Sequence, residues 1–103
     1  MILLAITLAA ATPEIFKSDS NMRIYGAGSN SCALGFAPKR ESETFTWIMG
    51  FWSGINAVYG TEGPIRVDGQ GIVGEVKKLC IDNPSMMIAE ATMKTYIRFS
   101  QQD

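Results

Sequence analysis

The 103-residue sequence contains no histidine, only two cysteines and almost no net charge. Without histidine the chain lacks the commonest general base and the commonest metal ligand, so His-dependent catalytic triads are excluded. Nine basic and ten acidic side chains give a net charge of −1, and no run of Lys or Arg is longer than two residues. This balance offers no basic surface for neutralising phosphates, so nucleic acid is not an expected partner.

The sequence also lacks an apolar run long enough to cross a membrane. A membrane-spanning helix needs about 20 apolar residues, whereas the longest run here, residues 1–11, is followed by Pro13. This run is uncharged and ends in small residues, which is typical of the apolar part of a secretory signal peptide, although no Lys or Arg precedes it. We expect a signal peptide over residues 1–11, with a merely apolar N-terminus as the alternative, and one helical domain over residues 12–103.

The compartment decides how Cys32 and Cys80 are interpreted. In an exported protein, two cysteines without histidine favour one structural disulfide, which would stabilise the fold by roughly 4 kcal/mol. In a cytosolic protein the same residues would be two reduced, buried thiols. Neither cysteine has CxxC spacing, and a zinc site would need ligands that the sequence lacks.

Apolar spacing and turn residues predict about four helices joined by glycine-rich loops. The clearest helix covers residues 41–59, where apolar side chains recur every three or four positions: Phe45, Ile48, Met49, Trp52, Ile55 and Tyr59. A short helix is expected near residues 31–36, capped at its start, and a third at about residues 72–81. The last is expected over residues 84–99, with Asn83 as its cap and Pro84 in its first turn.

Glycines mark two further features. Residues 60–71 hold four glycines and a proline, which predicts a long loop, and long loops in compact domains are more often functional than short ones. Gly50 and Gly54 lie inside the helix predicted at residues 41–59, where each costs about 1 kcal/mol relative to alanine. Their presence predicts that another backbone approaches this side closely, with a local kink as the alternative.

Two short segments resemble cofactor or metal loops without completing them. Residues 24–30 resemble the start of a dinucleotide-binding loop, but the third glycine and the following βαβ unit are missing. Residues 68–71 resemble part of a calcium loop, but the alternating ligands and the closing Glu are absent. We therefore predict no cofactor, no metal site and no catalytic residues.

Two segments carry a family resemblance. One is the helix whose motif positions are Trp47, Gly50, Phe51, Ser53, Gly54 and Asn56, and the other is the junction from Cys80 to Pro84. In order and spacing they resemble small exported helical proteins of the HdeA-like family, which includes acid-stress chaperones and type VI secretion immunity proteins of related fold. The resemblance implies a small all-α bundle in which Cys32 and Cys80 are paired, tying the short first helix to the third.

The resemblance and the composition together favour a non-enzymatic periplasmic or secreted domain that binds another protein, of the immunity or inhibitor type. Its partner would be a toxin or effector. The candidate partner surface is the loop at residues 60–71 with the nearby aromatic side chains, represented by Tyr59, Arg66 and Asp68. A homodimer is left open.

The first alternative is an acid-stress chaperone that exposes its apolar face to unfolded client proteins. Without histidine, its switch would have to use carboxylates, which titrate near pH 4 when unperturbed. Protonating all ten acids would take the side-chain charge from −1 toward +9, and self-repulsion then favours opening. The second alternative, a small hydrolase, would need a catalytic carboxylate pair that the sequence does not offer in a recognisable arrangement.

Overall fold

A computed structural model describes residues 23–59 and 67–101, so the predicted signal peptide lies outside the described residues. Within these ranges the fold is all-α. The elements are η2 (Gly26–Ser29), a short 3₁₀ helix, followed by the helices α2 (Cys32–Gly35), α3 (Glu41–Tyr59), α4 (Gly69–Asp82) and α5 (Ile88–Ser100). Cys32 and Cys80 form a disulfide that joins α2 to α4. The prediction of a small, disulfide-linked all-α bundle is therefore confirmed.

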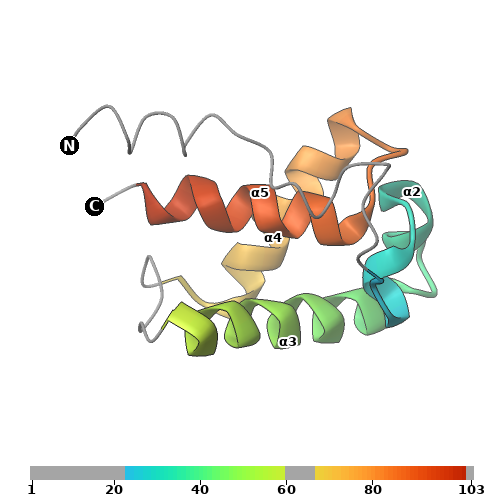
Figure 1. Ribbon diagram of the computed structural model, residues 1–103. Coiled ribbons are helices and arrows are strands. Elements are labelled where there is room, and N and C mark those ends of the chain that lie inside the picture. Colours follow the sequence, from blue (N-terminus) through green and yellow to red (C-terminus); the bar gives the residue numbers. More distant parts are fainter. Residues whose placement is uncertain (1–22, 60–66, 102–103) are drawn as a thin grey trace.

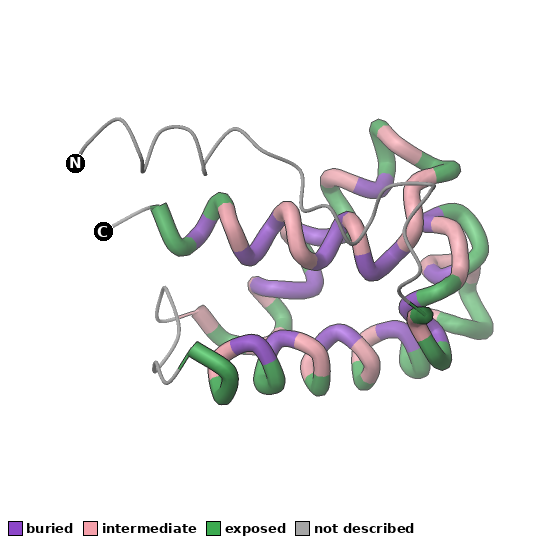
Figure 2. The backbone as a smooth tube through the Cα atoms, in the orientation of Figure 1, coloured by how far each residue is buried: buried purple, intermediate pink, exposed green. Residues whose placement is uncertain are grey.

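The helices pack in two layers around one core. In Figure 1, α3 and α5 run side by side in the same direction, and α4 crosses behind them. The short elements η2 and α2 lie at the end where α3 and α5 begin. Figure 2 shows the buried sides of α3 and α5 facing each other. The fully enclosed centre contains Ile48, Val76, Ile88, Ala91 and the disulfide.

Helix α3 has the predicted bounds, and its apolar stripe is mostly inward. Ile48, Trp52 and Ile55 are buried, and the Trp52 ring meets the ring of Tyr96 edge-on at a centroid distance of 4.8 Å. Tyr59, the last residue of the apolar spacing and one of the predicted partner-surface residues, has a side chain that is 68% exposed at the C-terminal end of the helix. The periodic pattern therefore continues one turn beyond the part of α3 that α5 covers.

Helix α4 begins at Gly69, three residues before the predicted start at residue 72. The predicted loop over residues 60–71 is therefore too long at its C-terminal end, and residues 60–66 lie outside the described part. Asp68 caps the helix, because its carboxylate accepts a hydrogen bond of 2.8 Å from the amide of Gly71. Gly69 faces the Met49 sulfur, which a Cβ at this position would approach to 3.0 Å. Gly69 and Gly71 therefore belong to the closely packed start of a helix and not to a loop.

Helix α5 begins at Ile88, four residues after the predicted start at Pro84. The intervening carbonyl groups are engaged by α2 instead: Cys32 donates to the carbonyl of Met86 at 2.7 Å, and Ala33 to that of Pro84 at 2.9 Å. Asn83 closes α4 rather than opening α5, since its side-chain amide donates to the carbonyl of Leu79. The turn between the last two helices therefore satisfies the free amide groups at the start of α2.

The predicted close approach of another backbone at Gly50 and Gly54 is wrong for the part of the chain that the structure describes. Both glycines are exposed, and a Cβ added to either would meet no atom within 4 Å. The close approaches occur instead at Gly28 and Gly35, where an added Cβ would collide with Trp47 and Ile88 respectively. Both lie in or beside the short N-terminal elements, which pack tightly against the long helices.

Candidate functional site

An open groove of about 580 Å³ lies between the first half of α3 and helix α4. Its apolar surface comes from three separate segments and includes Phe36 and Pro38, Phe45, and Val73. The two aromatic side chains are half-buried, so part of each ring faces the groove. Concave surfaces with an apolar floor and a few polar groups are the usual sites of ligand and partner binding.

Gly74 gives the groove its width on the α4 side. It lines the groove between Gln70 and Lys77, one helical turn from each. A Cβ at Gly74 would meet no atom within 4 Å, so the space beside its backbone is empty of protein. The groove is therefore preformed at the position where most helices would present a side chain.

An ion pair between Lys77 of α4 and Glu41 of α3 bridges the groove at one end. Both side chains are nearly half exposed, and the Lys77 ammonium group also lies 5.8 Å from the centre of the Phe36 ring. An exposed pair of this kind contributes about 1 kcal/mol at most, so an incoming charged group can compete for either partner.

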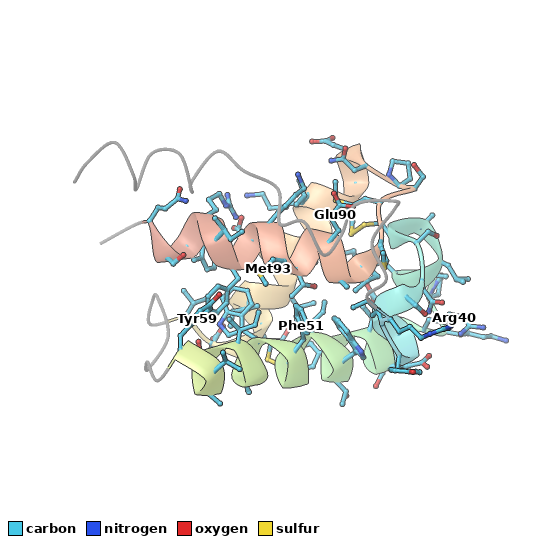
Figure 3. The ribbon with its side chains drawn as sticks, in the orientation of Figure 1. Arg40, Phe51, Tyr59, Glu90 and Met93 are labelled. Atoms are coloured by element: carbon cyan, nitrogen blue, oxygen red, sulfur yellow. A yellow bond between two sulfur atoms is a disulfide. The ribbon has the colours of Figure 1, made fainter. Side chains whose placement is uncertain are left out.

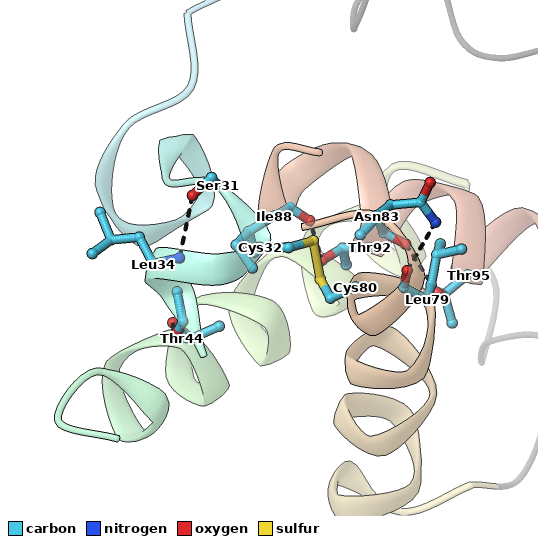
Figure 4. The surroundings of a disulfide bond; sticks show 12 residues. Ser31, Cys32, Leu34, Thr44, Leu79, Cys80, Asn83, Ile88, Thr92 and Thr95 are labelled. Carbon is cyan, nitrogen blue, oxygen red and sulfur yellow. Dashed lines mark hydrogen bonds between the residues drawn. A yellow bond between two sulfur atoms is a disulfide. The ribbon is translucent and has the colours of Figure 1, made fainter. Parts of the chain in front are cut away.

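The disulfide fixes the walls that meet at this end of the groove. Cys32 and Cys80 have Cα atoms 5.2 Å apart, and the amide of Phe36 donates to the carbonyl of Cys32. Lys77 lies one turn before Cys80 on α4. Figure 4 shows α2 held between α4 and α3, with Thr44 beside it; the Thr44 hydroxyl donates to the carbonyl of Gly35 at 2.6 Å. The crosslink thus sets the spacing between the Phe36 and Lys77 walls.

The residues of the predicted motif helix do not gather into one site. Trp47 stacks on Phe51 at a centroid distance of 4.8 Å, and its indole N–H donates to the carbonyl of Tyr25 at 2.8 Å. In Figure 3, Phe51 extends from α3 toward α5. Asn56 accepts a 2.7 Å hydrogen bond from the hydroxyl of Tyr96. These three motif residues therefore attach η2 and α5 to α3.

The other three motif residues, Gly50, Ser53 and Gly54, are exposed on the outer side of α3. The Tyr96 hydroxyl, which bonds to the motif residue Asn56, has a raised pKa because burial penalises its charged form and because Tyr59 lies nearby. The hydroxyl thus remains a neutral donor at physiological pH. Its role is to connect two helices.

The predicted partner surface lies only partly within the described residues. Tyr59 is exposed at the C-terminal end of α3, as Figure 3 shows, and Asp68 is exposed but serves as the cap of α4. Arg66 lies outside the described residues. The groove itself was not predicted, because its floor and its ion pair join residues far apart in the sequence. The sequence signal that could have indicated the groove was Gly74, a glycine inside the helix predicted at residues 72–81. The open space beside it is visible only in the structure.

A second, smaller hollow of about 300 Å³ lies between α4 and α5 and is strongly charged. Glu75 lines this hollow and accepts hydrogen bonds from Arg98 at 2.9 Å and from Lys78 at 3.5 Å. The hydrogen bond from Arg98 is the main cause that holds the pKa of the Glu75 carboxyl below its ordinary value, against a smaller opposing effect of burial. This carboxylate links α4 to α5.

The residues described in the structure contain no cluster of three or more side chains suited to holding a metal ion. Among these residues there is also no helix with the length and apolar character needed to cross a membrane. Comparison of the chain with family models, curated proteins and solved structures found no match.

Proposed function

We propose that this chain is a small exported, non-enzymatic domain that binds another protein, of the immunity or inhibitor type. The groove between α3 and α4 carries this proposal. It combines an apolar floor, a gap at Gly74 and an exchangeable ion pair between Glu41 and Lys77. These features suit the insertion of a side chain or short segment from a partner.

The groove offers little for catalysis. Among the residues that the structure describes, the only carboxylate that lines it is Glu41, whose partner is Lys77. General acid–base chemistry usually needs a second titratable group within reach of the same substrate atoms. Cooperation between Glu41 and another acid of the groove is therefore not available, which favours binding over hydrolysis.

The resemblance to HdeA-like proteins supports the same proposal. The disulfide joins the short helix α2 to α4, which is the connection that the resemblance implies for Cys32 and Cys80. Because a disulfide needs an oxidising compartment to form and persist, this pairing also supports export. Under the proposal the partner is a toxin or effector protein that meets the domain outside the cytosol.

Replacing Gly74 by leucine tests the proposal. The new side chain has room, since a Cβ at Gly74 meets no protein atom within 4 Å, and leucine is a better helix former than glycine. We expect the Gly74→Leu protein to fold but to fill the groove, lowering retention of the partner about tenfold, which corresponds to about 1.4 kcal/mol. The measurement is quantitative mass spectrometry of proteins retained from a periplasmic extract by the immobilised, oxidised domain.

Gly50→Leu is the matched control. Gly50 is likewise a helical glycine with open space for a Cβ, but it lies on the outer side of α3 and not among the residues that line the groove. It should retain the same partner as the unsubstituted domain. Equal retention by Gly74→Leu, or equal loss in both variants, contradicts binding through the groove.

A second candidate function is the acid-stress chaperone, which the attachments of α4 favour. An ion pair joins Glu41 of α3 to Lys77 of α4, and another joins Glu75 of α4 to Arg98 of α5. The carboxyl group of Glu75 loses its charge as the pH falls through its lowered pKa, whereas the disulfide at Cys80 does not titrate. Acid would therefore weaken the polar attachments of α4 while leaving its covalent one.

This candidate predicts a pH dependence that involves Glu75. Its folded-state pKa lies below the ordinary value of 4.5, so its ion pairs stabilise the fold above that pH, and this contribution is lost as the pH falls through the lowered pKa. We expect the free energy of unfolding to fall below pH 4.5 and to fall less steeply in a Glu75→Gln variant. Urea titrations followed by circular dichroism at a series of acidic pH values measure both slopes.

Glu43→Gln is the control for this experiment. Within the described part of the chain, Glu43 pairs only with Arg40, three residues away, at 3.7 Å, so its loss detaches no described helix. If Glu75→Gln and Glu43→Gln change the slope equally, the attachment of α4 is not the cause. A client-aggregation assay at about pH 2–3, which is below the pKa of about 4 of an unperturbed carboxyl group, decides the function. A domain that stays folded there and protects no client is not an acid-stress chaperone.

A further inference from the structure

We infer that the groove takes an apolar segment of the partner that is followed, at the Pro38 end of the groove, by a carboxylate. This inference rests on the proposed function, since it names the partner chemistry that the same groove fits. It follows from the distribution of charge along the groove and beside it.

The middle of the groove is uncharged on both walls. On the α3 side it is lined by Ser42, Phe45 and Thr46, and on the α4 side by Gln70, Val73 and Gly74. A charged side chain inserted here would lose water without gaining an ion pair, and such burial is unfavourable. An aliphatic or aromatic side chain would instead cover the exposed parts of Phe45 and Val73, which is favourable in proportion to the apolar area removed from water.

At and beside the Pro38 end of the groove, the described residues carry one positive side chain more than negative ones. Lys77 is paired with Glu41 there, and Arg40 is paired with Glu43. Pro38 lines the groove, and Lys39 follows it in the chain. The Lys39 side chain is exposed and makes no ion pair with any residue that the structure describes. A partner carboxylate at this end would be attracted by Lys39 and could also compete for Lys77, whereas a partner cation would be repelled.

Short synthetic peptides test this charge preference. Three peptides share one core containing leucine and phenylalanine and differ only in the two residues that follow it, which are glutamates, glutamines or lysines. Each is titrated into the oxidised full chain while amide NMR shifts are recorded. We expect the glutamate peptide to shift the amides of Phe45, Val73 and Gly74 and to bind about threefold more tightly than the glutamine peptide, as for an exposed ion pair.

Two variants assign the preference to Lys39. In Lys39→Gln the glutamate and glutamine peptides should bind alike, whereas Lys78→Gln, the same substitution on the far side of α4 in the hollow beside α5, should keep the difference. Added salt should reduce the preference, because the charges involved are exposed.

The inference is wrong if the lysine peptide binds as tightly as the glutamate peptide, or if no peptide shifts the amides of the groove. Neither result removes the proposed function, which the Gly74→Leu retention experiment judges separately. Conversely, the Gly74→Leu variant could retain the protein partner while the unsubstituted domain prefers the glutamate peptide. That pair of results would contradict the proposed function and leave the groove's charge preference standing.

Discussion

Replacing both Cys32 and Cys80 by alanine is expected to lower the free energy of unfolding by about 4 kcal/mol. The two residues are separated by 48 positions, so the disulfide closes a long loop of the unfolded chain and restricts its conformational freedom. Small domains have only about 5–15 kcal/mol of stability in total. The loss is therefore a large fraction of what holds the fold together.

The remaining contacts of α2 are too few to replace the disulfide. The helix has only four residues, and so short a helix has no stability of its own in water. Its amides at Cys32 and Ala33 bond to carbonyls of the turn between α4 and α5, but each such bond contributes only about 1 kcal/mol net. Without the crosslink we expect α2, and with it the Phe36 wall of the groove, to separate from α4 more readily.

Guanidinium titrations of the oxidised protein, the reduced protein and the double alanine variant measure this effect. The reduced protein and the variant should unfold at similar denaturant concentrations, both well below that of the oxidised protein. Cys32→Ala alone should behave like the double variant. If the oxidised protein and the double variant unfold together, the disulfide does not stabilise the domain.

The sequence predicts those elements whose signals are local. Helix α3 was predicted with its observed bounds because its apolar spacing and its first-turn carboxylates, Glu41 and Glu43, act within the helix itself. The start of the short helix is likewise predicted, with Ser29, Asn30 or Ser31 as its cap, and in the structure Ser31 is the cap, since its hydroxyl accepts from the amide of Leu34. In both cases a few neighbouring residues determine the conformation.

The errors arise where a distant segment decides the local structure. Pro84 suits the first turn of a helix, but its carbonyl bonds to Ala33 at the start of α2, so α5 begins later. Gly69 and Gly71 suggest a loop, but both belong to the first turn of α4, whose N-cap is Asp68. The groove is less predictable still, because Phe36, Phe45 and Val73 come from three segments. No local pattern marks a surface that only the packing of α2, α3 and α4 creates.

Gly28→Ala is expected to lower the free energy of unfolding by about 3 kcal/mol, the upper part of the usual range for overpacking. Gly28 is buried against the face of Trp47, and an added Cβ would lie 2.1 Å from the ring atom Cζ2. The ring cannot move away easily. Its N–H is bonded to the carbonyl of Tyr25, and its other neighbour is the stacked ring of Phe51. A methyl group at Gly28 must therefore displace η2 or break these contacts.

A second substitution shows whether the collision is the cause. Trp47→Leu removes the ring that the new methyl group would meet, so Gly28→Ala should cost much less in a Trp47→Leu background, although Trp47→Leu is itself destabilising. Urea titrations of the two single variants and the double variant give this coupling, for which we expect about 2 kcal/mol, within the range seen for residues in contact. An equal loss of stability in both backgrounds would mean that glycine is required at position 28 by its backbone conformation and not by the lack of room for a Cβ beside the Trp47 ring.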